Sequence, residues 1–466
     1  MAAFSDFISS VSNLLYSYIL IIVLIAGGLY FTVRTKFLPF RLFKDQLRAV
    51  TEKSSNGVSS FQALMISTAS RVGTGNIIGV STALCIGGFG SVFWMWLIAI
   101  IGSSSAFIES TLAQIYKKKG ADGCYGGPAY YIEAALKNRF LAVVFSVLLI
   151  LTYGFGFNML ASYNLQSTFS AYSFYDEKTT PWIIGFIVAA LVCYCLLGGG
   201  KRIVKITELL VPIMGTAYVV VALIVVIMNI RLLPSVFVRI FEEAFDFQAI
   251  FGGFGGSCIM YGIKRGLFSN EAGVGSAPNA SASAEVSHPV KQGLVQVLSV
   301  FIDTILICSA TAFLCMCSGV EPSEEISGAA YVQESLRVTL GGFGPVFITV
   351  AMILFAFTTL LGNLYYVDKG ITHIAKRELG KGAMTVIHII LSAAIFVGSG
   401  LSAGLLWDIA DILMGGMTLI NIPVIVILSK YALSALKDYE KKKKSGAALD
   451  FKAKDIWLPH EVDCWK

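Results

Sequence analysis

The sequence predicts an all-α protein that crosses a membrane about eleven times, and three observations lead to this fold class. Of its 466 residues, 56% are hydrophobic and only 14% are charged, whereas soluble domains carry roughly 25% charged residues. Apolar stretches long enough to span a bilayer recur along the whole chain. Two of these stretches are interrupted by glycines and charged residues, which predicts helices that break at membrane depth.

The eleven stretches follow from the thickness of the hydrocarbon core, which is about 30 Å and needs roughly 20 helical residues. They lie at 15–33, 62–86, 91–116, 140–170, 181–198, 206–228, 250–283, 292–318, 344–367, 383–400 and 405–429. No positive charge precedes the first stretch, and others follow it closely. We therefore expect it to remain in the mature protein rather than to act as a cleaved signal peptide.

Basic residues gather in every second loop, and this pattern predicts the orientation. Six of them follow the first span between Arg34 and Lys53, while the loops of the opposite side are acidic, as at Glu242 and Glu243. By the positive-inside rule the basic side is cytoplasmic. The N-terminus is then outside the cell and the lysine-rich tail inside. Since the net charge of +6 is spread over loops, nucleic-acid binding is not expected.

The two interrupted stretches divide the chain. They read SRVGTGNIIG at 70–79 and GIKRGLFSNEAGVGSAPNASASAEVSHP at 262–289. After the first span is set aside, they belong to the first and sixth of ten spans, the spacing typical of an inverted-repeat transporter. We expect an N-terminal helix and basic loop (1–61), two inverted five-helix repeats (62–249 and 250–430) and a charged, solvated tail (431–466).

The break in the first core helix is expected at Gly73, Thr74 and Gly75. A broken helix leaves free amides where its second half begins, and glycine lets a ligand approach the backbone closely. These amides could hold a carboxylate. The side-chain oxygens of Thr74 and Asn76, together with free carbonyl groups, suit a sodium ion.

The break in the sixth core helix is expected between Gly266 and Asn270 or Glu271. Leu267, Phe268 and Ser269 would then line a pocket opposite the first break. The two breaks together form one wall that favours cations and another that favours anions. Such a pocket fits a zwitterion beside a metal ion. For the small residues that follow, tight helix packing is the competing interpretation.

Six charged residues are expected at membrane depth, and their charges balance. They are Arg71, Lys264 and Arg265 against Glu109, Glu271 and Asp303. Buried charges are costly unless paired, so we expect them to act as gates or structural pairs, or, for Lys264, to reach the interface. This balance favours a substrate without net charge.

Several classes of protein are excluded for want of the necessary motifs. The sequence has no G-x-x-x-x-G-K-[ST], H-E-x-x-H or G-x-S-x-G pattern, and an enzyme is not expected. The nine cysteines lie mostly within spans without a C-x-x-C pair, so we interpret them as apolar filling rather than as metal ligands or disulfides.

Three segments resemble the alanine/glycine:cation symporter family. They are FQALMISTASRVGTGNIIG, GGPAYYIE and, above all, RGLFSNEAGVGSAPNASASAEVSHPVKQGLVQ. The family is similar to the leucine-transporter-type fold, with two inverted five-helix repeats after an extra first helix. The resemblance implies symport of a small neutral amino acid, such as alanine or glycine, with sodium as the coupling ion.

The resemblance also implies where the ligands bind. The substrate would contact Gly73, Thr74, Gly75 and Asn76 in the first broken helix and Phe268, Ser269, Asn270 and Glu271 in the second. Sodium would bind at Ala69, Val72, Asn76, Thr358 and Thr359, although a threonine in an apolar helix ordinarily bonds to its own helix.

One position departs from the family pattern. Where members often read T-T-x-L-G-W, this chain has Asn363 in place of the tryptophan. A smaller, polar residue at the pocket predicts acceptance of a longer neutral amino acid, such as glutamine.

We expect a monomer that imports its substrate by alternating access. A proton-coupled transporter that titrates Glu271, Asp303 or Lys264 is one alternative. A non-transporting amino-acid sensor is the other, and the short loops argue against it.

Overall fold

The computed structural model describes residues 2–52, 57–120, 123–246, 248, 257–458 and 462–465. Among these residues, eight helices are long and apolar enough to cross a membrane. They span Ser5–Arg34, Ser91–Ile115, Arg139–Ala171, Gly199–Met228, Pro289–Met316, Phe343–Ala375, Lys381–Gly398 and Ala403–Ser445. Thr180–Leu196 is a shorter apolar helix. The chain is thus a mostly helical, multi-pass membrane protein.

In the described parts of the chain, loops and turns separate the α-helices and the two β-strands. The α-helices are α1 (Ala2–Leu14), α2 (Leu20–Arg34), α3 (Leu38–Arg41), α4 (Phe43–Val50), α5 (Ser60–Arg71), α6 (Val80–Gly87), α7 (Ser91–Ile115), α8 (Pro128–Leu136), α9 (Arg139–Ile150), α10 (Phe157–Ser167), α11 (Thr180–Leu196), α12 (Gly199–Met228), α13 (Leu233–Ala244), α15 (Cys258–Asn270), α16 (Pro278–Ser281), α17 (Pro289–Val300), α18 (Ser309–Met316), α19 (Ala329–Leu340), α20 (Phe343–Ala375), α21 (Lys381–Gly398) and α22 (Ala403–Ser445). The strands β1 (Lys118–Gly120) and β2 (Gly123–Tyr125) form an antiparallel hairpin.

Wider and tighter helical turns join several of these helices. The π-helical turns are η1 (Leu15–Ile19), η2 (Gly75–Gly79), η3 (Leu151–Gly156) and η7 (Phe301–Cys308), and the 3-10 turns are η4 (Thr168–Ala171), η5 (Ile230–Leu232), η8 (Glu324–Ile326) and η9 (Ala453–Ile456). Because π turns are rare and frequent at functional sites, the contact between η2 and η7 marks a region of interest.

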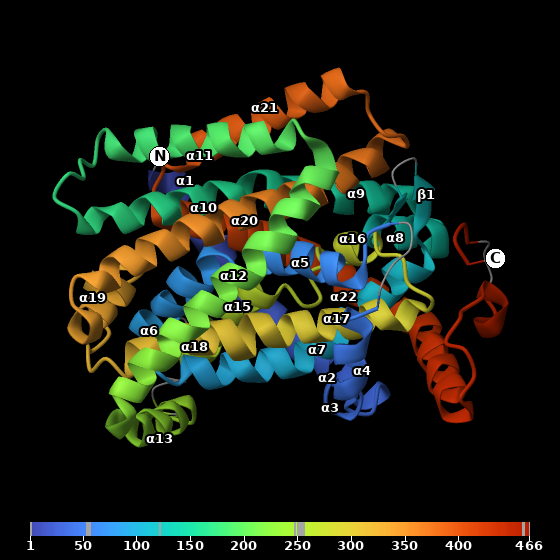
Figure 1. The fold of residues 1–466 in the computed structure, drawn as a ribbon, viewed down its shortest axis with the longest axis horizontal. Helices are drawn as coiled ribbons and strands as arrows, with labels where there is room; N and C mark the ends of the chain where they lie inside the picture. The colour runs from blue at the N-terminus through green and yellow to red at the C-terminus, as the bar shows by residue number, and fades with distance from the viewer. Residues whose placement is uncertain are drawn as a thin grey trace.

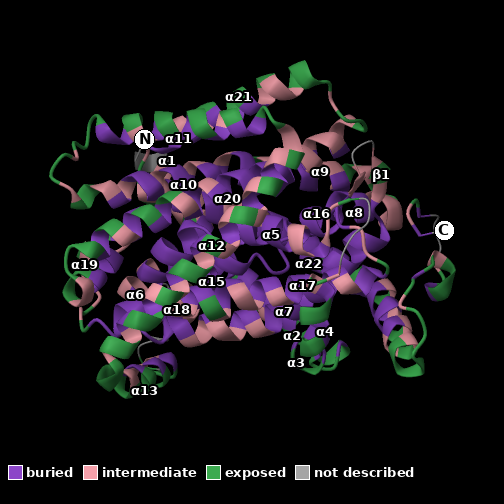
Figure 2. Cartoon of the chain, in the orientation of Figure 1, coloured by how far each residue is buried: buried purple, intermediate pink, exposed green. Residues whose placement is uncertain are grey.

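The long helices form a bundle whose two ends differ. The short helices α13 and α19 lie at one end, and β1, α8 and the C-terminus lie at the opposite end (Figure 1). Burial is greatest on the central helices and least on the rim (Figure 2). In α7, 72% of the most apolar window is buried, against 28% in α12 and α21. The central helices therefore carry the site, and the outer ones face lipid.

The first broken helix consists of α5, η2 and α6. Ser59 caps its start through a capping box with Gln62. The helix ends at Arg71, and Val72 leaves the helical region with ψ 87° before η2 resumes the helical course. A Cβ atom added at Gly73 would overlap the Oγ1 atom of Thr359, so the break is packed closely against α20.

The second broken helix consists of α15, an irregular link at 271–277 and α16. The expectation that its first half ends near Gly266 is wrong, because α15 continues to Asn270, and the second half, expected to begin near Asn270 or Glu271, begins at Pro278. Gly266 serves close packing instead, since an added Cβ would lie 2.7 Å from Ile98 on α7. The chain turns at Gly273 and Gly275, whose φ angles of +86° and +91° favour glycine.

The tail also differs from its prediction. Helix α22 continues to Ser445, and most described residues beyond it are exposed, but four apolar side chains of this segment are packed against the bundle. Phe451, Ile456, Val462 and Trp465 each expose at most 8% of their surface.

Candidate functional site

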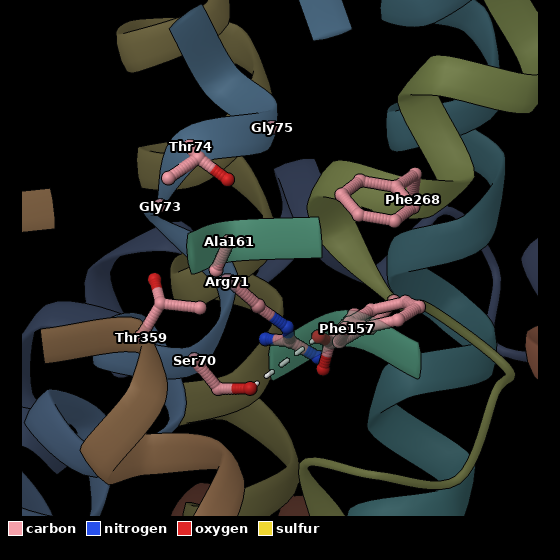
Figure 3. A pocket seen from close by; sticks show the side chains of 10 residues that line it. Ser70, Arg71, Gly73, Thr74, Gly75, Phe157, Ala161, Phe268 and Thr359 are labelled. Carbon is pink, nitrogen blue, oxygen red and sulfur yellow. Dashed lines mark hydrogen bonds between the residues drawn. The ribbon is translucent and has the colours of Figure 1, made fainter. Parts of the chain in front are cut away.

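A small pocket lies between the two breaks. Only about 10 Å³ of it is open to the centre of a water molecule, which is room for roughly one water. Its walls come from both broken helices and from α10 and α20 (Figure 3). They are formed by Ser70, Arg71, Gly73, Thr74, Gly75, Phe157, Ala161, Phe268, Glu271 and Thr359. An amino acid therefore enters only when the walls move apart.

Asn76 links the two broken helices. Its side-chain oxygen accepts a hydrogen bond of 2.8 Å from the amide of Gly73 and so closes the break of its own helix. Its side-chain nitrogen donates to the hydroxyl of Ser269 at 2.9 Å and to the carboxylate of Asp303 at 2.7 Å. The predicted residues Asn76 and Ser269 thus meet, but they do so beside the pocket rather than on its lining.

Asp303, on η7, is a fully buried acid held only by neutral groups. It accepts hydrogen bonds from Asn76 (2.7 Å), from the hydroxyl of Ser269 (2.7 Å) and from that of Thr304 (2.8 Å). No cation of the described chain lies within salt-bridge distance of it. Its negative charge therefore has no direct partner among the described residues.

Glu271 ends helix α15 and faces the pocket. Its backbone is left-handed, with φ +52° and ψ 21°, a region that costs a non-glycine residue roughly 1–2 kcal/mol. Its carboxylate accepts hydrogen bonds from Ser276 at 2.5 Å and from Ser70 at 3.4 Å. This acid therefore joins the link of the second broken helix to the end of α5.

Glu109, on α7, fastens the same link from the other side. Its carboxylate accepts a hydrogen bond from the side chain of Asn421 at 2.8 Å and one from the amide of Gly273 at 3.4 Å. Asn421 also donates to the carbonyl of Gly273 at 2.9 Å and accepts from the hydroxyl of Tyr131 at 2.5 Å. The charged residues predicted at Glu109 and Glu271 thus flank one seven-residue link.

Arg71 is the cation of the pocket. Its Nη1 atom donates to Gln296 at 3.0 Å, whereas Nε and Nη2 have no hydrogen-bond partner in the part of the chain that the structure describes. Figure 3 shows the side chain reaching from the first break toward Phe157. The guanidinium is 2% exposed, so its unpartnered donors favour an anionic group in the pocket.

Lys264 and Arg265 do not pair with the predicted acids. The ammonium of Lys264 lies 2.9 Å from a carboxylate oxygen of Asp411, and the Arg265 guanidinium lies 3.5 Å from the same oxygen and stacks on the ring of Trp407. The predicted balance of three charges against three is therefore wrong. Asp411 lies within the last predicted span, close to Asp408, and the acids in that apolar stretch were the signal for a further buried charge.

The two threonines of α20 behave differently. Thr359 lines the pocket and donates to the carbonyl of Ala69 at 3.0 Å, across the interface with the first broken helix. Thr358 donates to the carbonyls of Leu354 and Phe355 in its own helix. The structure thus brings Thr359 to the break, while Thr358 makes the local bond that is usual for a threonine in an apolar helix.

Asn363 and Asn270 lie near the pocket without lining it. Asn363 accepts a hydrogen bond from the hydroxyl of Ser70 at 2.6 Å and donates to Asn158 at 2.9 Å. The side-chain oxygen of Asn270 accepts from the amide of Ala272 at 3.0 Å. Both residues hold the pocket walls in place.

Aromatic rings close the side of the pocket opposite Thr74. The ring of Phe268 lies 4.5 Å from that of Phe157 and 4.8 Å from that of Trp407. A Cβ atom at Gly75 would lie 2.7 Å from the Phe268 ring. Phe157 and Ala161 were not predicted, although Asn158 and Asn164 mark α10 as a helix with polar residues inside an apolar stretch.

Known proteins resemble this chain in sequence and in fold. A sequence model of the sodium:alanine symporter family matches residues 1–453. The chain is 42% identical to the amino-acid carrier protein AlsT of Bacillus subtilis over 465 residues, covering 99% of this chain and 98% of that one. It is 43% identical to the probable sodium/glutamine symporter GlnT of the same organism, covering 97% and 94%. The crystal structure of MhsT with L-phenylalanine is similar in fold, with a TM-score of 0.59 at 14% identity over 83% of this chain and 93% of that one.

Proposed function

Because the chain belongs to the sodium:alanine symporter family, we propose that it imports a small neutral amino acid together with sodium by alternating access. This family consists of secondary transporters and not of enzymes. The match confirms the family resemblance of the sequence, which is most extensive in the segment that begins at Arg265. The plasma membrane is the proposed location.

Cation coupling is supported by a shortage of positive charge around the pocket. Glu271 and Arg71 both line the pocket. Two further buried carboxyl groups, those of Glu109 and Asp303, are hydrogen-bonded to the two broken helices. Lys264 and Arg265 are engaged with Asp411. A buried carboxylate without a partner is costly, so these groups favour the entry of a cation. A zwitterionic substrate adds no net charge and leaves this demand unchanged.

The pocket offers a separate place for each end of an amino acid. We place the carboxylate at the start of η2, at Gly73, Thr74 and Gly75, where helix amides favour an anion. The free donors of Arg71 support this orientation. The ammonium group then lies toward Glu271 and the end of α15. The aromatic rings beside Phe268 cover the side chain of the substrate.

The proposed sodium site lies between the first broken helix and α20. Its ligands are the carbonyls of Ala69 and Val72, the hydroxyls of Thr358 and Thr359, and the side-chain oxygen of Asn76. The bond of 3.0 Å between Thr359 and the Ala69 carbonyl supports this place, because both oxygens are hard ligands. Thr358 joins only after its hydroxyl turns away from its own helix.

Alanine, glycine and glutamine are the proposed substrates. Asn363 is hydrogen-bonded to Ser70, which lines the pocket. Asn363 therefore affects the shape of the pocket through the position of Ser70. A polar residue there, together with similarity to a protein named as a glutamine symporter, supports acceptance of the longer side chain.

The proposed topology has eleven spans: an extra first helix and two inverted repeats of five, with domain limits at 1–61, 62–249, 250–430 and 431–466. The eight long helices, α11 and the two broken helices support this number. The N-terminus is placed outside and the tail in the cytoplasm, and the working unit is a monomer.

Uptake into proteoliposomes tests the function. With an inward sodium gradient and the pH clamped, labelled alanine and glutamine are expected to accumulate, and one net charge moved across about 100 mV corresponds to roughly fiftyfold accumulation. Accumulation that persists without sodium but needs an inward proton gradient would establish the proton-coupled alternative. Binding without any uptake would contradict transport altogether.

A further inference from the structure

The segment beyond α22 packs on the end of the bundle that carries β1 and β2. The indole of Trp465 donates to the carbonyl of Gln114, at the end of α7, at 2.7 Å, and its ring lies 4.8 Å from the ammonium of Lys117. The amide of Phe451 donates to the carbonyl of Ser287 at 3.0 Å. This segment, residues 447–458 and 462–465, is called the strap below.

The strap covers the point where the second broken helix is tied to α7. Gln114 donates to the carbonyls of Ser281 and Ala284, and Lys117 donates to that of Ala284 at 2.9 Å. These carbonyls belong to the chain that leaves α16. The strap therefore rests on α7 and, through Ser287, on the path that leads out of the second break. Helix α7 and the second broken helix can therefore move relative to each other only if the strap shifts or detaches.

Two cysteines meet where the strap contacts the β-hairpin. The sulfur of Cys124, on β2, lies 3.7 Å from that of Cys464. Both are free thiols and neither is fully buried. Cys464 also contacts the carbonyl of Lys117 at 3.6 Å. A disulfide has a sulfur–sulfur distance of about 2.05 Å, so a closure of about 1.7 Å joins the strap covalently to the hairpin.

We propose that Cys124 and Cys464 form a redox-sensitive pair, which closes to a disulfide in the presence of a peroxide and locks the strap onto the bundle. This modification site is independent of the residues assigned to the substrate and to sodium.

The surroundings make Cys124 the attacking thiol. The hydrogen bond from Cys464 and the charge of Lys117 lower the pKa of Cys124 to about 6, against the opposing effects of burial and of Glu285. The same hydrogen bond raises the pKa of Cys464. This direction favours Cys124 as the thiolate, which is the nucleophilic form of cysteine.

The reaction balances with hydrogen peroxide as the oxidant. The thiolate of Cys124 attacks one peroxide oxygen, so that a sulfur–oxygen bond forms, the oxygen–oxygen bond breaks, and the departing hydroxide takes a proton to become water. The sulfur of Cys464 then attacks that of Cys124. A disulfide forms, the sulfur–oxygen bond breaks, and a second water leaves with the proton of Cys464. Two thiols lose two electrons, and one peroxide becomes two waters.

A thiol count on the full chain tests the pair without reference to transport. The reconstituted protein is treated with hydrogen peroxide, denatured, labelled with a maleimide and weighed. The wild type contains nine free cysteines and is expected to lose two labels, which return after reduction with dithiothreitol. Cys124→Ser and Cys464→Ser are expected to form no disulfide. The matched control is Cys193→Ser, a partly exposed cysteine on α11, which is expected to behave like the wild type.

Peptide mapping of the oxidised protein identifies the partners. A linked pair of peptides that contain Cys124 and Cys464 supports the proposal. Retention of all nine labels, or a disulfide between other cysteines, overturns it. Since this readout needs no substrate, its failure is distinct from a failure of the proposed symport.

Uptake measured on the same samples tests the lock. Oxidation is expected to lower wild-type uptake by about fivefold or more, the low end of couplings between sites, and dithiothreitol is expected to restore it. Cys464→Ser is expected to keep its uptake under peroxide. A disulfide that leaves uptake unchanged, or an equal loss in Cys464→Ser, overturns the lock.

Discussion

The two broken helices reach the same pocket by different means. In the first, α5 ends at Arg71 and η2 begins at Gly75, so that the break is three residues long. In the second, seven residues separate α15 from α16. The short break is held by close packing, because the glycines that bound it leave no room for a Cβ atom against Thr359 and Phe268. The long break is held by the carboxylates at its two sides.

Each break is therefore sensitive to a different kind of substitution. A break held by close packing is sensitive to added volume. A link held by buried carboxylates and their donors is sensitive to the loss of charge or of a hydrogen bond. Substitutions that add volume and substitutions that remove a charge or a hydrogen bond are thus expected to affect the two breaks differently.

Gly73→Ala adds volume to the short break. The new methyl group overlaps Thr359, and overpacking costs about 1–3 kcal/mol. Since the affected atoms lie in the pocket, we expect uptake to fall by about a hundredfold, toward the upper limit of that range. Initial rates in proteoliposomes at matched protein density measure it. The control is Gly404→Ala, where an added Cβ meets no atom within 4 Å; equal losses in the two variants would contradict the role of packing.

Asp303→Asn removes charge and adds almost no volume. Three donors serve this carboxylate, and hydrogen bonds to charged groups contribute about 1.5–3 kcal/mol each. We expect the sodium concentration for half-maximal uptake to rise by about tenfold or more, and the thermal unfolding temperature to fall, because at least one buried donor loses its acceptor.

The control for this charge is Glu334→Gln, which neutralises an exposed acid paired with Arg337. Its sodium dependence is expected to match the wild type. If Asp303→Asn had the same sodium dependence as the wild type, the carboxylate of Asp303 would not contribute to cation binding at the pocket.

Asn363→Ala removes two hydrogen bonds from the wall of the short break. Ser70 and Asn158 lose their partner, and a neutral hydrogen bond contributes about 1 kcal/mol. We expect the ratio of glutamine to alanine uptake to change by about fivefold, measured by competition. Asn363→Trp adds bulk at the same place and is expected to disfavour glutamine. An unchanged ratio in both variants would end the proposal that this position selects the substrate.

The presence of both breaks could be predicted from the sequence, because glycines and charges inside an apolar stretch disfavour a continuous helix at membrane depth. The end of α15 could not, since Gly266 and Gly273 look alike in a sequence although one packs against α7 and the other turns the chain. Thr358 and Thr359 are adjacent, and only the position of α20 shows which of them faces Ala69.

The contacts of the charged residues were harder still. Asp411 is the counter-charge of Lys264 and Arg265, yet it lies far from both of them along the chain, and sequence spacing carries no information about such a contact. Phe157 enters the pocket from α10, and although the polar Asn158 follows it, the sequence does not show which side of this helix faces the breaks. The charged residues of the strap that the structure describes are exposed, as its composition predicts, but Phe451 and Trp465 are buried against the bundle, and the sequence does not show which of its aromatic residues make such contacts.

Glu271 combines a strained backbone with a side chain that the fold uses. Its backbone adopts the left-handed conformation that glycine accepts without cost, and its side chain joins Ser276 to Ser70. A glycine there would relax the backbone but discard both of these hydrogen bonds. The two effects on stability oppose each other, whereas the loss of the carboxylate removes an acid from the pocket wall in either case. Such backbone strain persists only where the surrounding contacts hold it.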